Sequence, residues 1–273
     1  MKAKDIVEAI DKAYLNKKKE KPRQYLGASI VGDGCTAYLS LSLRGFQDTP
    51  PDPKLMRIFE DGHRIEDRVV KDLVNAGFDV SNIDGFTGKQ HAFQKFGGHF
   101  SGHADGIIII DDQDHLLEIK SMNEGRFKDF VRQGVRSSHP KYYAQMQAMM
   151  GMSGLRRAMF IAYNKNTSEY HVEFIEFDEF YYSGLEAKVE GVLAGSALRI
   201  SEDDTDWRCR ACFKRDACWN PSYHAEITAT NGATCAKCMH SLPSVNGQWH
   251  CNKHNREALE ICGDWSLFKV TPK

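Results

Sequence analysis

The spacing of apolar residues divides the first 195 residues into helices and strands. Apolar positions recur every three or four residues over residues 3–15 and again from Leu55 to Leu73, which predicts two amphipathic helices, the second ended by Gly77. From Gln90 the period changes to two, so the segments HAFQKF, HFSGHADGIIII and HLLEIKS indicate consecutive antiparallel strands. The run of isoleucines at 107–110 predicts a strand buried on both faces.

The rest of the chain predicts two further helices, two strands, a last helix and a cysteine-rich tail. The helices span about 124–133, 139–152 and 178–193, and the strands are AMFIAYNK and YHVEFIEF. This order favours an α/β fold with one mixed central sheet flanked by helices. Residues 205–273 contain few aliphatic side chains, so we expect this part to need metal in order to fold. Its bulky apolar anchors over 228–273 are Trp249, Leu259, Trp265 and Phe268.

Composition and charge say more about where the protein is located than about its reaction. Lys and Arg number 36 against 37 Asp and Glu in 273 residues, so any basic surface must be local. No apolar run reaches the roughly 18 residues of a membrane span, and the amino terminus lacks the apolar core of a secretory signal, so no membrane partner and a cytoplasmic location are expected. Basic residues that could follow a phosphate backbone are scattered: Arg44, Lys89, Arg126, Lys128, Arg132 and Arg136.

Two carboxylates and a lysine carry the chemistry of the predicted sheet. Glu118 and Lys120 are two apart on a strand and therefore share a face, and the preceding strand can bring Asp105 alongside. Carboxylate oxygens suit Mg²⁺, which keeps several waters and binds phosphate, while a lysine can position water and stabilise charge. The arrangement predicts a phosphodiesterase site. The alternative is that all three are ordinary strand and turn residues.

These motifs in this order resemble the PD-(D/E)xK nuclease superfamily, which has a restriction-endonuclease-like core, and within it the RecB-like and phage λ-type exonuclease branch. The resemblance covers about residues 25–195 and rests on GHADG, LEIKS and the helix YYAQMQ. It implies that Asp105 and Glu118 bind Mg²⁺ or Mn²⁺, joined by the carbonyl of Ile119, and that Lys120 is catalytic.

Two predicted helices whose motifs resemble those of the superfamily offer further site residues. The segment GHRIED carries both His63 and Glu66, three apart on one helix face, and branches of the superfamily use either type as a metal ligand. Gln145 would act from the YYAQMQ helix. Met149 stands where a tyrosine often follows that glutamine, which leaves Tyr142 or Tyr143 for the aromatic contact with DNA.

The eight cysteines fall into two sets that indicate metal sites, because cytosolic thiols stay reduced. Cys209, Cys212 and Cys218 are one thiolate short of a closed site, and Cys35 can supply the fourth. One early and three late cysteines resemble the iron–sulfur nucleases, namely the AddB-type nuclease domains and the CRISPR-adaptation exonucleases. This implies a [4Fe–4S] cluster that staples together a nuclease domain of residues 1–222, with Zn²⁺ as the alternative.

The second set predicts a zinc-binding module over residues 228–273. The pair Cys235 and Cys238 is followed by Cys251 and Cys262, which together complete a four-thiolate site for Zn²⁺. His254 is an alternative ligand, since Cys251 and His254 form a compact second pair.

The leading hypothesis is therefore a metal-dependent DNA exonuclease that acts on a free end in phage-type recombination, replication or repair. A recombination protein or a single-strand-binding protein is an expected partner. Two alternatives remain open: a restriction-like or structure-specific endonuclease, and a non-catalytic nucleic-acid-binding module with purely architectural metal sites.

Overall fold

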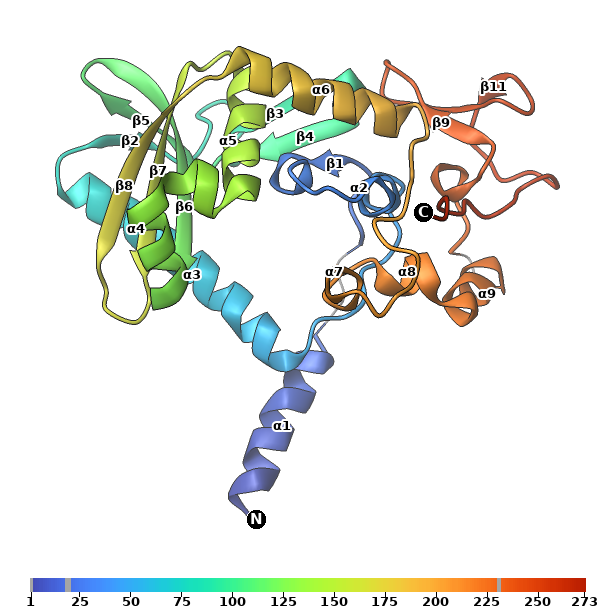
Figure 1. Ribbon diagram of the computed structural model, residues 1–273, viewed down its shortest axis with the longest axis horizontal. Helices are drawn as coiled ribbons and strands as arrows, with labels where there is room; N and C mark the ends of the chain where they lie inside the picture. The colour runs from blue at the N-terminus through green and yellow to red at the C-terminus, as the bar shows by residue number, and fades with distance from the viewer. Residues whose placement is uncertain (1, 18–20, 230–231) are drawn as a thin grey trace.

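Two β-sheets form the centre of the computed structural model, which describes residues 2–17, 21–229 and 232–273 (Figure 1). The larger sheet has the order β2-β5-β6-β7-β8. Its β6 and β7 are parallel and its other pairs antiparallel. The smaller sheet has the order β1-β4-β3, with β1 and β4 parallel. The strands are β1 (Leu26–Gly27), β2 (Asp79–Ser81), β3 (Ala92–Lys95), β4 (Phe100–His103), β5 (Gly106–Ile110), β6 (Gln113–Met122), β7 (Arg157–Asn164) and β8 (Tyr170–Glu176).

The predicted α/β class, a central mixed sheet flanked by helices, is confirmed, but the prediction of one sheet is wrong in detail. The chain changes sheet between β4 and β5, so HAFQKF and HFSGH pair with each other and form a separate sheet with β1 instead of extending the central sheet. Ala104 and Asp105 form this junction, where the Ala104 amide donates to the His91 carbonyl and the Asp105 carboxylate accepts from the Ile119 amide. Periodicity predicts strands but not which neighbours they pair with.

Helices cover both faces of the large sheet. On one face lies α3 (Pro53–Asn75), which Asp52 caps by accepting from the Leu55 amide and which ends before Gly77, as predicted. Its Val69 packs on β5 and β6. On the other face lie α4 (Glu124–Ser138), broken at Gly134, and α5 (Pro140–Ser153). Over α5 packs α6 (Glu179–Leu193), which runs along the top of Figure 1.

The isoleucine run of β5 is not buried on both faces. Ile108 is fully buried beneath α3, whereas Ile109 on the opposite face keeps 41% of its surface exposed. The reason is that α4 packs on β6, β7 and β8 and α5 on β6 and β7, which leaves this face of β5 uncovered.

The amino-terminal helix α1 (Ala3–Leu15) projects from the rest of the molecule in Figure 1 and contacts α3. Its Tyr14 hydroxyl donates to Glu60, and its Asp11 pairs with Arg57. No helix in the described part of the chain is long and apolar enough to cross a membrane.

The cysteine-rich tail packs against α2 (Thr36–Leu43) and carries a small antiparallel sheet. Its remaining elements are α7 (Trp207–Arg210), α8 (Arg215–Trp219), α9 (Pro221–Ala229), β9 (Ser241–Pro243), β10 (Trp249–Cys251) and β11 (Arg256–Glu257), and short 3₁₀ turns lie at Ala28–Ile30, Phe96–Gly98 and Cys235–Lys237. Leu267, Phe268 and Val270 join a core with Leu41 and Phe46. Leu259, expected as an anchor, is 72% exposed and does not act as one.

Arg44, at the end of α2, is buried inside the tail and is not available to follow a phosphate backbone. Its Nη1 donates to the carbonyls of Ala236 (2.8 Å) and Cys238 (3.0 Å), and its Nη2 donates to that of Ser241 (3.0 Å). Its guanidinium carbon lies 3.8 Å from the centroid of the Phe268 ring. Burial lowers the pKa of Arg44 to about 10, against attraction by Cys238. Scattered charge in a sequence does not distinguish such a structural arginine from a surface one.

A second contact joins the tail to the small sheet. Gly97 and Gly247 approach so closely that a side chain on either would collide with the other's backbone. Beside them, His99 Nε2 lies 3.1 Å from the carbonyl oxygen of Gln248. The division into residues 1–222 and 228–273 stays a prediction, but the two parts share a packed interface.

Candidate active site

Asp105 is fixed at the point where the chain passes between the two sheets. The antiparallel register places Gly106 opposite Leu117, so Asp105 arrives beside Glu118. Its Oδ2 accepts a hydrogen bond of 2.7 Å from the Ile119 amide. The carboxylate is thereby oriented by the backbone of the strand that carries the other two residues.

Glu118 and Lys120 lie on one face of β6, as their spacing predicts, and form a buried ion pair. Glu118 is completely buried; its Oε1 pairs with the Lys120 ammonium, and its Oε2 has no hydrogen-bond partner among the described residues. Burial raises the pKa of Glu118 to about 7, although the positive charge of Lys120 opposes the rise. A buried carboxylate without hydrogen bonds is costly unless a cation lies against it.

Lys120 lies at the centre of this group. Its Nζ donates to the Ile119 carbonyl at 3.0 Å and lies 3.8 Å from Asp105 Oδ2. Burial lowers the pKa of Lys120, but the negative charges of Glu118 and then Asp105 outweigh this effect and raise it overall. The lysine is therefore charged and held between two carboxylates.

α3 adds a third carboxylate, that of Glu66, and leaves its other candidate ligand, His63, in a more exposed position. Glu66 is 31% exposed, and burial followed by repulsion from Asp105 raises its pKa. His63 is 80% exposed, and its Nδ1 lies 3.4 Å from Glu66 Oε2. Glu66 therefore faces the carboxylates, while His63 lies one helical turn outside them.

The three candidate residues of α5, Tyr142, Tyr143 and Gln145, have different surroundings. The Tyr142 ring centroid lies 5.6 Å from Lys120 Nζ, and the ring stacks on His139. Tyr143 points away and packs edge-on against Tyr181 beneath the guanidinium of Arg136. Gln145 is 8% exposed on the same helix. Of the two tyrosines left open by the sequence, Tyr142 is the one whose ring lies against the Lys120 ammonium.

Cys35, Cys209, Cys212 and Cys218 line one cavity of about 360 Å³. Cys35 precedes α2, and the other three belong to the α7–α8 segment. Burial raises the pKa of Cys209, Cys218 and Cys212, to about 11 for Cys212, and the neighbouring Cys35 adds to each rise. In the described part of the chain, no three of these sulfurs lie within 4.8 Å of one another.

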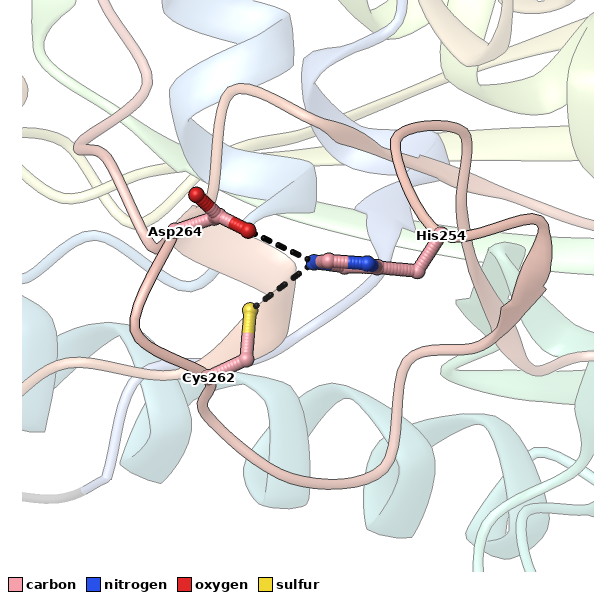
Figure 2. Close-up of side chains that lie close together, drawn as sticks. All are labelled: His254, Cys262 and Asp264. Atoms are coloured by element: carbon pink, nitrogen blue, oxygen red, sulfur yellow. Dashed lines mark hydrogen bonds and ion pairs between the residues drawn. The ribbon is translucent and has the colours of Figure 1, made fainter.

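The tail holds a second and much smaller cavity, of about 20 Å³, lined by Cys235, Cys238, Cys251, Cys262 and His254. Figure 2 shows the His254 ring pointing its Nε2 at two neighbours, with Cys262 Sγ at 3.5 Å and Asp264 Oδ2 at 3.1 Å. The ligand atoms of these three residues all lie within 4.8 Å of one another. Asp264 did not emerge from the sequence analysis, although a carboxylate two residues after a candidate ligand is a signal that could have found it.

The chain matches no protein-family model and no curated protein. Among solved structures it is similar to an alkaline exonuclease (LHK-Exo) from Laribacter hongkongensis, with 22% identity and a TM-score of 0.45 over 68% of this chain and 91% of that one. The structure of LHK-Exo in complex with dAMP gives 21% identity and a TM-score of 0.49 over the same shares. A phage related exonuclease from Haemophilus somnus 129PT gives 11% and 0.43 over 62% and 91%. At these identities the likenesses concern the fold alone.

Proposed function

We propose that this chain is a metal-dependent DNA exonuclease that hydrolyses phosphodiester bonds at Asp105, Glu118 and Lys120. The observation that carries the proposal is the fully buried Glu118 carboxylate, which pairs with Lys120 beside Asp105 and whose Oε2 has no hydrogen-bond partner among the described residues. Asp105, Glu118 and the Ile119 carbonyl are the oxygen donors that Mg²⁺ or Mn²⁺ takes. Glu66 adds a further carboxylate at the same place.

When bound, the divalent ion would supply positive charge against the phosphate oxygens and lower the pKa of a water. The residues of the chain have separate tasks around it. Ile119 N–H holds the Asp105 carboxylate in one orientation. The Lys120 ammonium is placed to orient a water and to stabilise negative charge on the phosphate. Glu66 and His63, at the outer side, can accept a proton or complete the ligand set.

Digestion of matched DNA forms tests the reaction. With Mg²⁺ or Mn²⁺, an exonuclease removes linear duplex and spares covalently closed circles, whereas nicking of the circles supports the endonuclease reading. No loss of either form in the presence of both metals would refute the enzyme proposal. The proposed setting, recombination, replication or repair with a partner protein, rests on the resemblance of the motifs.

The geometry of the first cysteine set supports a [4Fe–4S] cluster over a single zinc ion. Tetrahedral Zn²⁺ with thiolates at about 2.3 Å brings sulfurs to about 3.8 Å from one another. Cys35, Cys209, Cys212 and Cys218 instead line a cavity of about 360 Å³, whereas the cavity lined by the four tail cysteines measures about 20 Å³. A cluster of several atoms fits such a space. Iron and sulfide analysis of anaerobically purified protein tests the assignment.

For the tail we propose a structural Zn²⁺ site. The cavity of about 20 Å³ between Cys235, Cys238, Cys251 and Cys262 has room for roughly one water-sized particle, which suits a single ion. His254 remains an alternative ligand, and its contact with Cys262 and Asp264 keeps it within reach of the site. Zinc analysis of the Cys238→Ser variant tests this, since full zinc occupancy in that variant would contradict it.

A further inference from the structure

A groove of about 580 Å³ opens between the first half of α3, α2 and the segment that follows α1. Met56, Phe59, Glu60 and His63 of α3 line one side, and Tyr38 and Ser42 of α2 contribute to its lining. The segment between α1 and β1 contributes Lys21, Pro22, Arg23 and Tyr25. Of the residues that line this groove, the proposed reaction gives a role to His63 alone.

The groove reaches the proposed catalytic group through His63. That side chain lines the groove while its Nδ1 lies 3.4 Å from Glu66 Oε2, and Glu66 faces Asp105 and Lys120. The groove therefore ends at His63, which contacts the Glu66 carboxylate.

The charge of the groove is positive and partly uncompensated. Four cations line it, Lys17, Lys21, Arg23 and Lys214, against two carboxylates, Asp48 and Glu60. Lys17 pairs with Glu60, and Lys214 pairs with Asp48. Within the described ranges, Lys21 and Arg23 make no ion pair, and both are exposed. Two free cations are thus available to an anionic ligand.

The remaining lining is aromatic and apolar. Tyr25 lies beneath Arg23, whose guanidinium carbon is 5.9 Å from the ring centroid, and Phe59 is 46% exposed. Pro50, Pro51 and Met56 complete this surface. Cations alternating with exposed rings are the features by which proteins hold single-stranded nucleic acid, with phosphates on the cations and bases on the rings.

We propose that this groove binds the single-stranded part of a DNA substrate and leads it to the carboxylates. The inference rests on the proposed function and names the form of DNA that this site takes. Its volume of about 580 Å³ lies in the range of small-ligand pockets, about 300–1,000 Å³, which suits a short stretch of one strand. The strand contacts Arg23 and Lys21 through phosphates and Tyr25 through a base.

Binding can be measured without cutting. The probe is a fluorescein-labelled oligodeoxythymidine of about 15 nucleotides, followed by anisotropy with the full chain in Ca²⁺ over a salt series, with a gel check that the probe stays intact. Arg23→Ala should weaken binding and lower the slope of log K against log salt by about 0.7, the value for one lost phosphate contact on a single strand. Tyr25→Ala should weaken binding about fivefold or more with the slope unchanged.

Lys71→Ala is the matched control, because Lys71 is exposed on α3, lies outside the groove and makes no ion pair in the described chain. It should leave affinity and slope as in the wild type. Circular dichroism and thermal melts identify any variant that fails to fold, and the double variant Lys21→Ala/Arg23→Ala provides a second test.

Two results would overturn the groove. The first is an affinity of the folded double variant for the single strand that equals the affinity of Lys71→Ala. The second is a double variant that loses more affinity for a blunt 15-base-pair duplex than for the single strand. Hydrolysis of bis-p-nitrophenyl phosphate separates this inference from the proposed function. A wild type that binds the strand but cuts neither DNA nor this small diester refutes the function and leaves the groove standing.

Discussion

Arg44→Ala tests whether the tail is part of the folded body or an appendage. The wild-type guanidinium donates three hydrogen bonds to the carbonyls of Ala236, Cys238 and Ser241 and is only 2% exposed. Alanine would leave three acceptors without their donor and a gap beside Phe268 and Trp249. Each hydrogen bond to a charged group contributes about 1.5–3 kcal/mol, but the buried arginine also loses its own hydration.

Each buried carbonyl left without its donor costs about 1–3 kcal/mol, and removal of the buried charge offsets part of this cost, so we expect a net loss of about 3–5 kcal/mol in the free energy of unfolding. The stability of Arg44→Lys should lie between those of the wild type and Arg44→Ala, since an ammonium keeps the charge but not the planar set of donors. Urea unfolding of the metal-loaded protein, followed by tryptophan fluorescence, measures this directly, because Trp249 lies 5.2 Å from the guanidinium.

The control is Arg132→Ala, whose side chain is 71% exposed and paired with Asp129, so a change within about 0.5 kcal/mol is expected. If Arg44→Ala costs no more than Arg132→Ala, the buried contacts do not hold the tail to α2. The reasoning from its hydrogen bonds would then be wrong.

Three further predictions concern the sites themselves. Glu118→Gln removes a buried charge, so the metal-free protein should melt at an unchanged or higher temperature. The cutting rate of this variant should fall about 10³-fold or more, and Mg²⁺ should no longer raise its melting temperature. Cutting within a few-fold of wild type would exclude Glu118 from the mechanism. Glu66→Gln should raise the Mg²⁺ concentration needed for half-maximal cutting more than His63→Ala does, because Glu66 faces the carboxylates and His63 is exposed; equal titrations would contradict this placement. Cys212→Ser should abolish the brown colour expected of a [4Fe–4S] protein but leave tail zinc in place, whereas Cys238→Ser should do the reverse, and loss of both metals in either variant would show that the two sites are not independent.

The local features of this protein follow from its sequence. The helix at 3–15, the capped α3 and the strands β5 to β8 of the large sheet agree with the spacing of apolar residues, because burial of one face imposes a period of 3.6 or 2 on each segment, whereas β2 was not predicted. The same local rule puts Glu118 and Lys120 on one face of β6, and a short turn brings Asp105 back beside them. Cys35 lines the same cavity as Cys209, Cys212 and Cys218, and their common metal site stays a prediction.

Contacts between distant segments were decided only by the tertiary structure. The change of sheet at Asp105, the burial of Arg44 in the tail and the approach of Asp264 to His254 depend on how finished elements pack, and no local period records that packing. Likewise, Tyr142 and Tyr143 are neighbours of the same type, and only the position of α5 on the sheet turns one toward Lys120 and the other toward Arg136. The sequence by itself predicted which side chains would carry the chemistry, because their types and spacing are local properties. Packing determined which of them meet, because burial depends on surfaces that come together only in the folded chain.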